Sequence, residues 1–250
     1  MKKLLLCTAA LTMFAGIGLE TGSNNVHADG QDVGQEAGSG AKTNTLLEID
    51  NSNNNTKPVN PDNTENELDN PQDNNVNNTK SRGELTLDAV PSLLNFGKMS
   101  DASETKGGYN TENITNGNMV NGNKQYYYAQ VTDHRAGAKG WKLTASMDNM
   151  NNMNNSDVNL NGASITLNSS GKASPAYNNN NTAPNTNTNV NLDPYKGPVN
   201  VINAEQGTGE NTWFDLFNSI QLKYGQSSTG TYKGQITWNL IDAPDSTQNQ

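Results

Sequence analysis

Short runs of alternating apolar and polar residues begin after Gly83 and dominate the second half of the chain. In residues 85–89 every second side chain is apolar, and Pro91 ends the run. A period of two places successive side chains on opposite faces of a β-strand. Similar runs, each bounded by Gly, Asn, Pro or Ser, follow at 125–132, 140–146, 163–167, 199–202, 219–224 and 232–241. This spacing predicts an all-β fold, an antiparallel β-sandwich or barrel of short strands.

Three stretches within this region depart from simple alternation. Residues 212–217 have the spacing of a single helical turn. Asparagine is concentrated in residues 148–161 and 177–191. Because asparagine tolerates turns and left-handed backbone, both asparagine-rich stretches are predicted to be long surface loops.

The residues before Gly83 are mostly polar. Residues 29–80 contain 10 acidic and 3 basic side chains and scarcely any large apolar one, so they carry most of the net charge of −9. Too little apolar surface is available there to offset the entropy of ordering. We therefore expect a disordered leader at 29–43, a domain at 44–246 whose β core starts at 83 after a disordered polar loop at 50–82, and a tail at 247–250. Within the domain, the apolar run 45–49 either forms a first strand or belongs to the disordered part.

The first 28 residues have the pattern of a secretory signal peptide. Lys2 and Lys3 precede a nearly apolar stretch, 4–19, and Ala28 closes a small-x-small cleavage pattern. That stretch of about 16 residues is shorter than the roughly 20 that span a bilayer. We expect cleavage at about Asp29 and a secreted chain that does not span the membrane. The only cysteine, Cys7, leaves with the peptide, so the exported domain has no disulfide.

Charge and histidine content narrow the possible functions. Residues 81–250 hold 14 acidic and 11 basic side chains with no Lys/Arg cluster, so the electrostatic footprint of a nucleic-acid binder is absent. His134 is the only histidine after the expected cleavage point, and we expect it in a loop. One imidazole does not supply the two or three nitrogen ligands of a usual zinc enzyme. No cofactor is expected.

A weak metal pattern occurs at Asp157, Asn159 and Asn161, which copy the opening of a calcium loop. The twelfth position of that loop is Asn168, where calcium binding requires Glu. Asn161 followed by Gly is also an ordinary hairpin turn signal. The turn is the favoured interpretation over calcium.

A glycosidase is the enzyme alternative, because such enzymes need only two carboxylates. No spacing singles out a pair, and no Gly-x-Ser-x-Gly elbow supports serine hydrolysis. We expect no catalysis. The carboxylate candidates are Asp133, Asp148, Asp157, Glu205, Glu210 and Asp215.

Two tryptophan-bearing strands carry the most specific motif. Residues 140–146 contain Trp141 and Leu143 on one face, and 232–241 repeats the arrangement with Trp238 and Leu240. Either both indoles fill the core, or at least one is partly exposed as a platform for a sugar ring, a role for which its flat apolar surface and single N–H donor are suited.

These segments resemble the two signatures of the WxL family, Trp-x-Leu and Tyr-x4-Thr-Trp-x-Leu-x3-Pro. Every fixed position of the second signature is matched, and the resemblance extends over roughly 44–246. It implies a Gram-positive surface protein held non-covalently on the cell wall, through peptidoglycan or another wall glycan. The motif residues carried over as ligand-binding are Trp141, Leu143, Tyr232, Thr237, Trp238, Leu240 and Pro244.

The resemblance also implies partners, because family members commonly act with a membrane-anchored WxL-interacting protein. In the alternative function, the domain is a protein interaction module that docks on that partner, and wall association is indirect.

Overall fold

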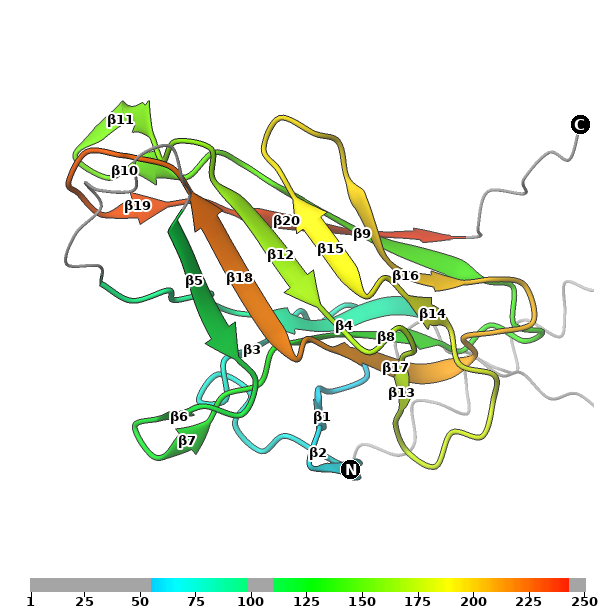
Figure 1. Cartoon of the computed structure of the whole chain (residues 1–250). Coiled ribbons are helices and arrows are strands. Elements are labelled where there is room, and N and C mark those ends of the chain that lie inside the picture. Colours follow the sequence, from blue (N-terminus) through cyan, green and yellow to red (C-terminus); the bar gives the residue numbers. More distant parts are fainter. Residues whose placement is uncertain (1–54, 99–109, 243–250) are drawn as a thin grey trace, which may run out of the picture. The chain divides into compact units, whose positions relative to one another are not determined.

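The computed structural model describes residues 55–98 and 110–242, and these residues form β-strands and no helix (Figure 1). They belong to one compact unit. None of the described segments is a helix of the length and hydrophobicity that a membrane crossing requires. The strands are β1 (Val59–Asn60), β2 (Asn63–Glu67), β3 (Val76–Asn78), β4 (Leu85–Pro91), β5 (Asn110–Thr115), β6 (Met119–Val120), β7 (Asn123–Lys124), β8 (Tyr128–Asp133), β9 (Trp141–Met147), β10 (Asn151–Asn152), β11 (Asn155–Asn159), β12 (Ser164–Asn168), β13 (Ser174–Pro175), β14 (Asn185–Thr186), β15 (Asn189–Leu192), β16 (Val199–Ala204), β17 (Asn211–Leu216), β18 (Ser219–Tyr224), β19 (Tyr232–Lys233) and β20 (Ile236–Asp242).

Three antiparallel sheets make up the body of this unit. The central sheet has the order β13-β17-β8-β4-β3, and the motif sheet, which contains both Trp-x-Leu segments, has the order β14-β16-β9-β20. The front sheet, β15-β12-β18-β5, faces the viewer in Figure 1. Smaller ribbons, β1-β2, β6-β7 and β11-β10-β19, complete the unit. The predicted all-β fold is confirmed.

One apolar core lies among the three sheets, and each sheet contributes its inward face. The central sheet supplies Val131 and Trp213, the motif sheet Leu143, and the front sheet Leu167 and others. In the front sheet buried and more exposed side chains alternate regularly, since β12 and β18 bury every second residue. Burial of these faces provides the main driving force for folding.

The segment 55–82 packs on the opposite face of the central sheet, and the expected disorder there is therefore wrong. Its few apolar side chains, Val59, Leu68 and Val76, are buried against Tyr128 and Phe214 of the central sheet. The backbone is held too, because the Val59 N–H donates to the Gln130 side chain at 2.8 Å and the Tyr128 hydroxyl donates to the Val59 carbonyl at 2.7 Å. A short, mostly polar segment is thus ordered by a few buried contacts.

The strands predicted from the sequence are confirmed, whereas the predicted helical turn and the long loops are not. All seven predicted strands in 85–241 are present, the last one split into β19 and β20. The predicted helical turn at 212–217 is wrong, since this stretch lies in β17 and the turn after it. The two asparagine-rich stretches are also more ordered than predicted, because they contain β10, β11, β14 and part of β15.

Turn positions follow the sequence more closely. Asn161 and Gly162 form a turn, with Gly162 at φ 59°, and His134 lies in a loop, both as expected. The possible strand 45–49, the signal peptide at 1–28, the leader at 29–43 and the tail at 247–250 lie outside the described residues.

Candidate functional site

The two Trp-x-Leu segments are hydrogen-bonded neighbours in the motif sheet. Strand β20 runs antiparallel to β9 with Leu240 opposite Leu143 and Trp238 opposite Ala145. Directly opposite residues of an antiparallel pair point to the same face. The large side chains of both segments therefore share the inward face of the motif sheet.

Trp141 and Leu143 are fully buried. Both are 0% exposed, and the Trp141 indole Nε1–H donates to the Gly209 carbonyl at 3.0 Å. The loop at Gly209 approaches so closely that a Cβ there would lie 2.8 Å from the indole nitrogen. The first Trp-x-Leu segment thus builds the core and anchors a loop, and its indole is not a surface platform.

Trp238 and Leu240 are only half-buried, because β20 is an edge strand that pairs with β9 alone. The Trp238 ring stacks on Phe217 with centroids 6.0 Å apart and an angle of 20° between the rings. Phe217 itself is buried. One indole of the motif is therefore inside and the other is partly exposed at the sheet edge.

Two further motif residues, Tyr232 and Thr237, lie apart from these side chains. Tyr232 is in β19, and its hydroxyl donates to the Ser228 carbonyl at 2.8 Å, which closes the loop before the strand. Thr237 is exposed and opposite Ser146 on the outer face of the motif sheet. Pro244 lies outside the described residues. The motif residues that the structure describes do not converge on one surface.

An arginine that sequence reasoning missed fixes the end of the motif sheet. Arg135 is buried, and its guanidinium donates to both carboxylate oxygens of the fully buried Asp133, each at 2.8 Å. It also donates to the Gly140 carbonyl at 2.9 Å and pairs with Asp242 at the end of β20. These charge-assisted bonds raise the pKa of Arg135 further. Arg135 joins the central sheet to both motif strands.

A second buried acid, Asp88, holds the 55–82 segment indirectly. Its carboxyl accepts hydrogen bonds from Thr86 and Thr132 at 2.6 Å and from Gln130 at 3.1 Å. Burial raises its pKa to about 7, although these hydrogen bonds act in the opposite direction. Gln130 also donates to the Lys57 carbonyl at 3.0 Å. The perturbed acid therefore belongs to the packing of the N-terminal segment.

Asp215 is a third buried acid, and it is not paired. It is 0% exposed, and neither carboxyl oxygen has a hydrogen-bond partner. Burial raises its pKa to about 7, while the nearby Ser169 and Thr186 hydroxyls act in the opposite direction. These two hydroxyls bond to each other at 2.9 Å. Asp215 lines neither of the two pockets described below.

The carboxylates considered for glycoside hydrolysis lie in different environments. Asp133 is bound to Arg135, Asp215 is in the interior, and Asp157 is exposed on β11. Asp148, Glu205 and Glu210 lie in loops between strands. Across the described residues, no group of three or more His, Cys, Asp or Glu side chains is placed to hold a metal ion.

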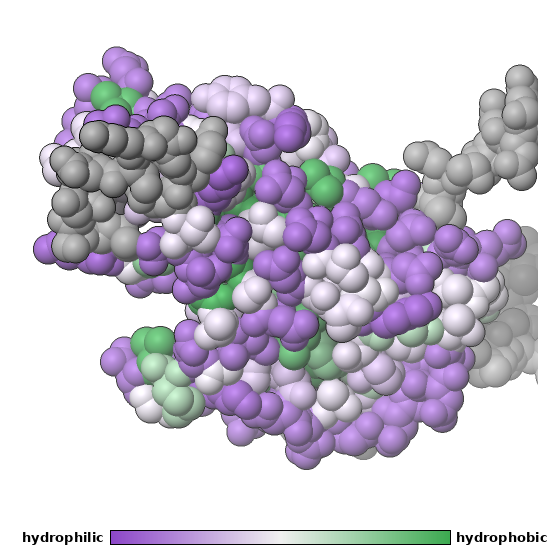
Figure 2. All heavy atoms as spheres, in the orientation of Figure 1, coloured by the Kyte–Doolittle hydropathy of each residue, from purple (hydrophilic) through white to green (hydrophobic). Residues whose placement is uncertain are grey.

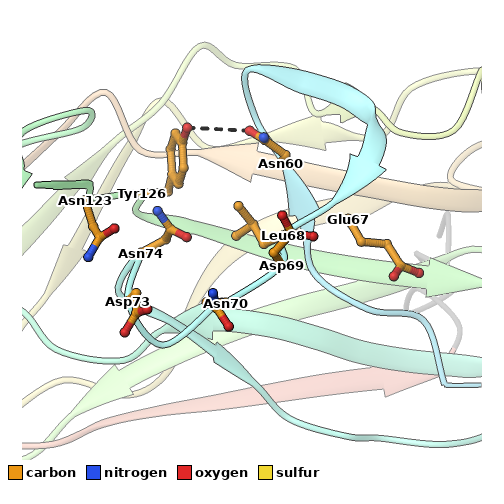
Figure 3. A pocket seen from close by; sticks show the side chains of 9 residues that line it. All are labelled: Asn60, Glu67, Leu68, Asp69, Asn70, Asp73, Asn74, Asn123 and Tyr126. Carbon is orange, nitrogen blue, oxygen red and sulfur yellow. Dashed lines mark hydrogen bonds between the residues drawn. The ribbon is translucent and has the colours of Figure 1, made fainter.

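A pocket is formed by the 55–82 segment against Tyr126 (Figure 3). It has a volume of about 240 Å³, and a second pocket of about 490 Å³ shares Asn60, Glu67 and Asp69 with it. The Tyr126 hydroxyl is already bound to Asp62 at 2.6 Å. Carboxylates and amides dominate the lining, and none of the described motif residues takes part. The lining residues are Asn60, Glu67, Leu68, Asp69, Asn70, Asp73, Asn74, Asn123 and Tyr126.

The fold and these sites define an all-β module that carries both Trp-x-Leu segments on paired strands of one sheet. The chain belongs to the WxL family. The family described as the WxL domain, surface cell wall-binding, matches residues 36–244, which is most of the chain. The chain is therefore a cell wall-binding surface protein. No curated protein and no solved structure matches the chain.

Proposed function

We propose that the protein attaches non-covalently to the bacterial cell wall by binding the glycan of peptidoglycan directly. The observation that carries this proposal is the family membership together with the outer faces of the sheets, which bear amides and hydroxyls. On the front sheet, Asn191, Thr166 and Gln221 lie on the outer face, opposite to the buried side chains of the same strands. Amides and hydroxyls both donate and accept hydrogen bonds, as sugar hydroxyl and acetamido groups require.

The signal-peptide pattern of residues 1–28 supports secretion as the route to the wall. Binding then takes place without catalysis. Trp141 and Leu143 act as the framework of the domain, and of the two motif indoles only Trp238 is exposed enough to touch a sugar ring.

A second function is favoured by one specific observation, the open edge of β20. Within the part of the chain that the structure describes, this seven-residue strand pairs with β9 only, so its other side presents backbone donors and acceptors. An extended segment of a protein partner fits such an edge by strand addition. In this alternative the partner carries the wall contact.

Cosedimentation separates the two functions. The full chain is mixed with protein-free peptidoglycan and, in parallel, with walls that retain their proteins. Direct attachment predicts pelleting with both, whereas partner docking predicts pelleting only with the untreated walls. A folded chain that stays in solution with protein-free peptidoglycan would refute the direct mechanism.

A further inference from the structure

We propose that the outer face of the front sheet is the surface that binds the wall polymer, and that it selects an uncharged, N-acetylated polysaccharide. This inference rests on the proposed function and names the binding surface for it. The surface, here called the amide face, consists of every second residue of four neighbouring strands. Its members are Thr111, Asn113, Thr115, Ser164, Thr166, Asn168, Asn189, Asn191, Ser219, Gln221 and Lys223.

The register of the front sheet aligns these side chains in straight rows. Asn191, Thr166, Gln221 and Asn113 are successive cross-strand partners, and the pairings of β12, β15, β18 and β5 contain no bulge. Neighbouring strands are about 4.8 Å apart, and same-face residues along a strand are about 6.8 Å apart. Such a regular grid matches an extended polymer with a repeating unit. The motif sheet lacks this regularity, because its register shifts between Asn200 and Ile202.

The rows are organised in advance by hydrogen bonds between side chains. The Asn191 side chain donates to the Thr166 hydroxyl at 3.0 Å, and the Gln221 side chain donates to the side-chain amide oxygen of Asn113 at 3.2 Å. In the next row Asn189 donates to Asn168 at 3.3 Å. Each amide keeps further donor or acceptor capacity beyond these bonds. Side chains that are already ordered lose less entropy when a ligand binds.

The composition of the amide face argues for a neutral ligand. Ten of its eleven side chains are uncharged, and the exception is Lys223. Residues 81–250, which include the front sheet, hold 14 acidic and 11 basic side chains, and this excess of acidic groups disfavours polyanionic wall polymers through like-charge repulsion. Figure 2, in the orientation of Figure 1, shows this side of the molecule as mostly hydrophilic, with a few small hydrophobic patches. An uncharged chain of hydroxyl and acetamido groups is the complementary partner.

An exposed aromatic ring follows the edge strand of this sheet. Tyr195 lies three residues after the end of β15 and is 75% exposed, the highest value among the exposed large apolar side chains that the structure describes. A tyrosine ring offers a flat surface for a sugar ring at low entropic cost. Tyr195 therefore supplies a stacking contact beside the hydrogen-bonding rows.

The test compares two matched triple variants of the full chain. The front variant replaces three amides of one row, Asn113→Ala, Asn191→Ala and Gln221→Ala. The control variant removes three amides from the outer face of the motif sheet, Asn185→Ala, Asn203→Ala and Asn239→Ala. Tyr195→Ala is a separate variant. Near-UV circular dichroism checks the fold of each protein, and binding is measured on peptidoglycan, chitin and cellulose particles.

The proposal predicts that the parent binds peptidoglycan and chitin more tightly than cellulose, which lacks acetamido groups. The front variant should bind at least about ten-fold more weakly and Tyr195→Ala about three- to ten-fold more weakly, with the control variant within two-fold of the parent. Equal binding by the parent and the front variant would refute the amide face as the binding surface but would leave the proposal of direct wall binding standing. Loss in the control variant alone would also refute the amide face. If the parent binds chitin but not peptidoglycan, the proposed function is refuted, whereas the amide face still stands as a surface that binds N-acetylated glycans. If the parent binds neither, both proposals are refuted.

Discussion

Replacement of the first motif indole, Trp141→Ala, is expected to destabilise the fold strongly. The side chain is 0% exposed, and its removal leaves a cavity that costs about 3–5 kcal/mol. The Gly209 carbonyl also loses the indole donor at 3.0 Å, which adds about 1 kcal/mol. Small domains have about 5–15 kcal/mol of stability, so a loss of this size should strongly lower the urea concentration at which the variant unfolds.

The matched control is Trp238→Ala in the second motif strand. This indole is half-buried and stacked on Phe217, so its loss should cost only about 1–2 kcal/mol. Urea unfolding followed by far-UV circular dichroism gives both free energies of unfolding. If Trp141→Ala unfolds at the same urea concentration as the parent and yet loses wall binding, the indole contacts the ligand and the assignment to the core is refuted.

Three further predictions concern the supports of the site. Arg135→Met should cost about 3–5 kcal/mol of unfolding free energy, because it leaves the buried Asp133 carboxylate unpaired; a change below 1 kcal/mol in urea unfolding would contradict this. Burial raises the pKa of Asp215 to about 7 from an ordinary 3.8, so the parent should lose stability as pH rises from about 4 to 7. Asp215→Asn should remove this contribution to the pH dependence of the free energy of unfolding, and the variant should be more stable than the parent above pH 7. If the pH dependence measured from pH 4 to 9 is the same in both proteins, the pKa of Asp215 is not raised. Gly209→Ala should destabilise by about 2 kcal/mol or more, because the new Cβ meets Ala204 at 2.5 Å. Gly207→Ala is the control, because Gly207 has a similar positive φ and open space around the Cβ. If the two variants have equal thermal unfolding midpoints, the loop at Gly209 accommodates the new Cβ without loss of stability.

Alternation of side chains was a reliable guide where one face of a strand is exposed. Strands β12 and β18 show it clearly, and both were predicted. Strand β17 was missed because Trp213 and Phe214, which are adjacent in the sequence, are both buried, so that its sequence shows no alternation.

The 55–82 segment shows why composition alone misled the prediction of disorder. Only three of its apolar side chains, Val59, Leu68 and Val76, are buried, too few for a core of its own. Its order depends on partners distant in sequence, such as Gln130, which binds the segment through both ends of its amide. No local pattern reveals such contacts.

The motif residues were predicted as a unit, and the sequence placed Trp238 and Leu240 correctly on one face. Which face is the core depends on how the sheets pack, and the structure places the large motif side chains inward. The amide face was missed, although its signal is present in the polar positions of 164–168, 189–192 and 219–223. Their arrangement in rows requires the strand order, which alternation does not give.

The most direct test of wall attachment through the amide face is chemical-shift mapping by NMR. Soluble peptidoglycan fragments are titrated into the labelled full chain. The account predicts shifts concentrated at Asn113, Thr166, Asn191 and Gln221 and at Tyr195, with the Trp141 indole signal unmoved. Shifts concentrated at Trp238 and the edge of β20, or no shifts at saturating fragment, would contradict it.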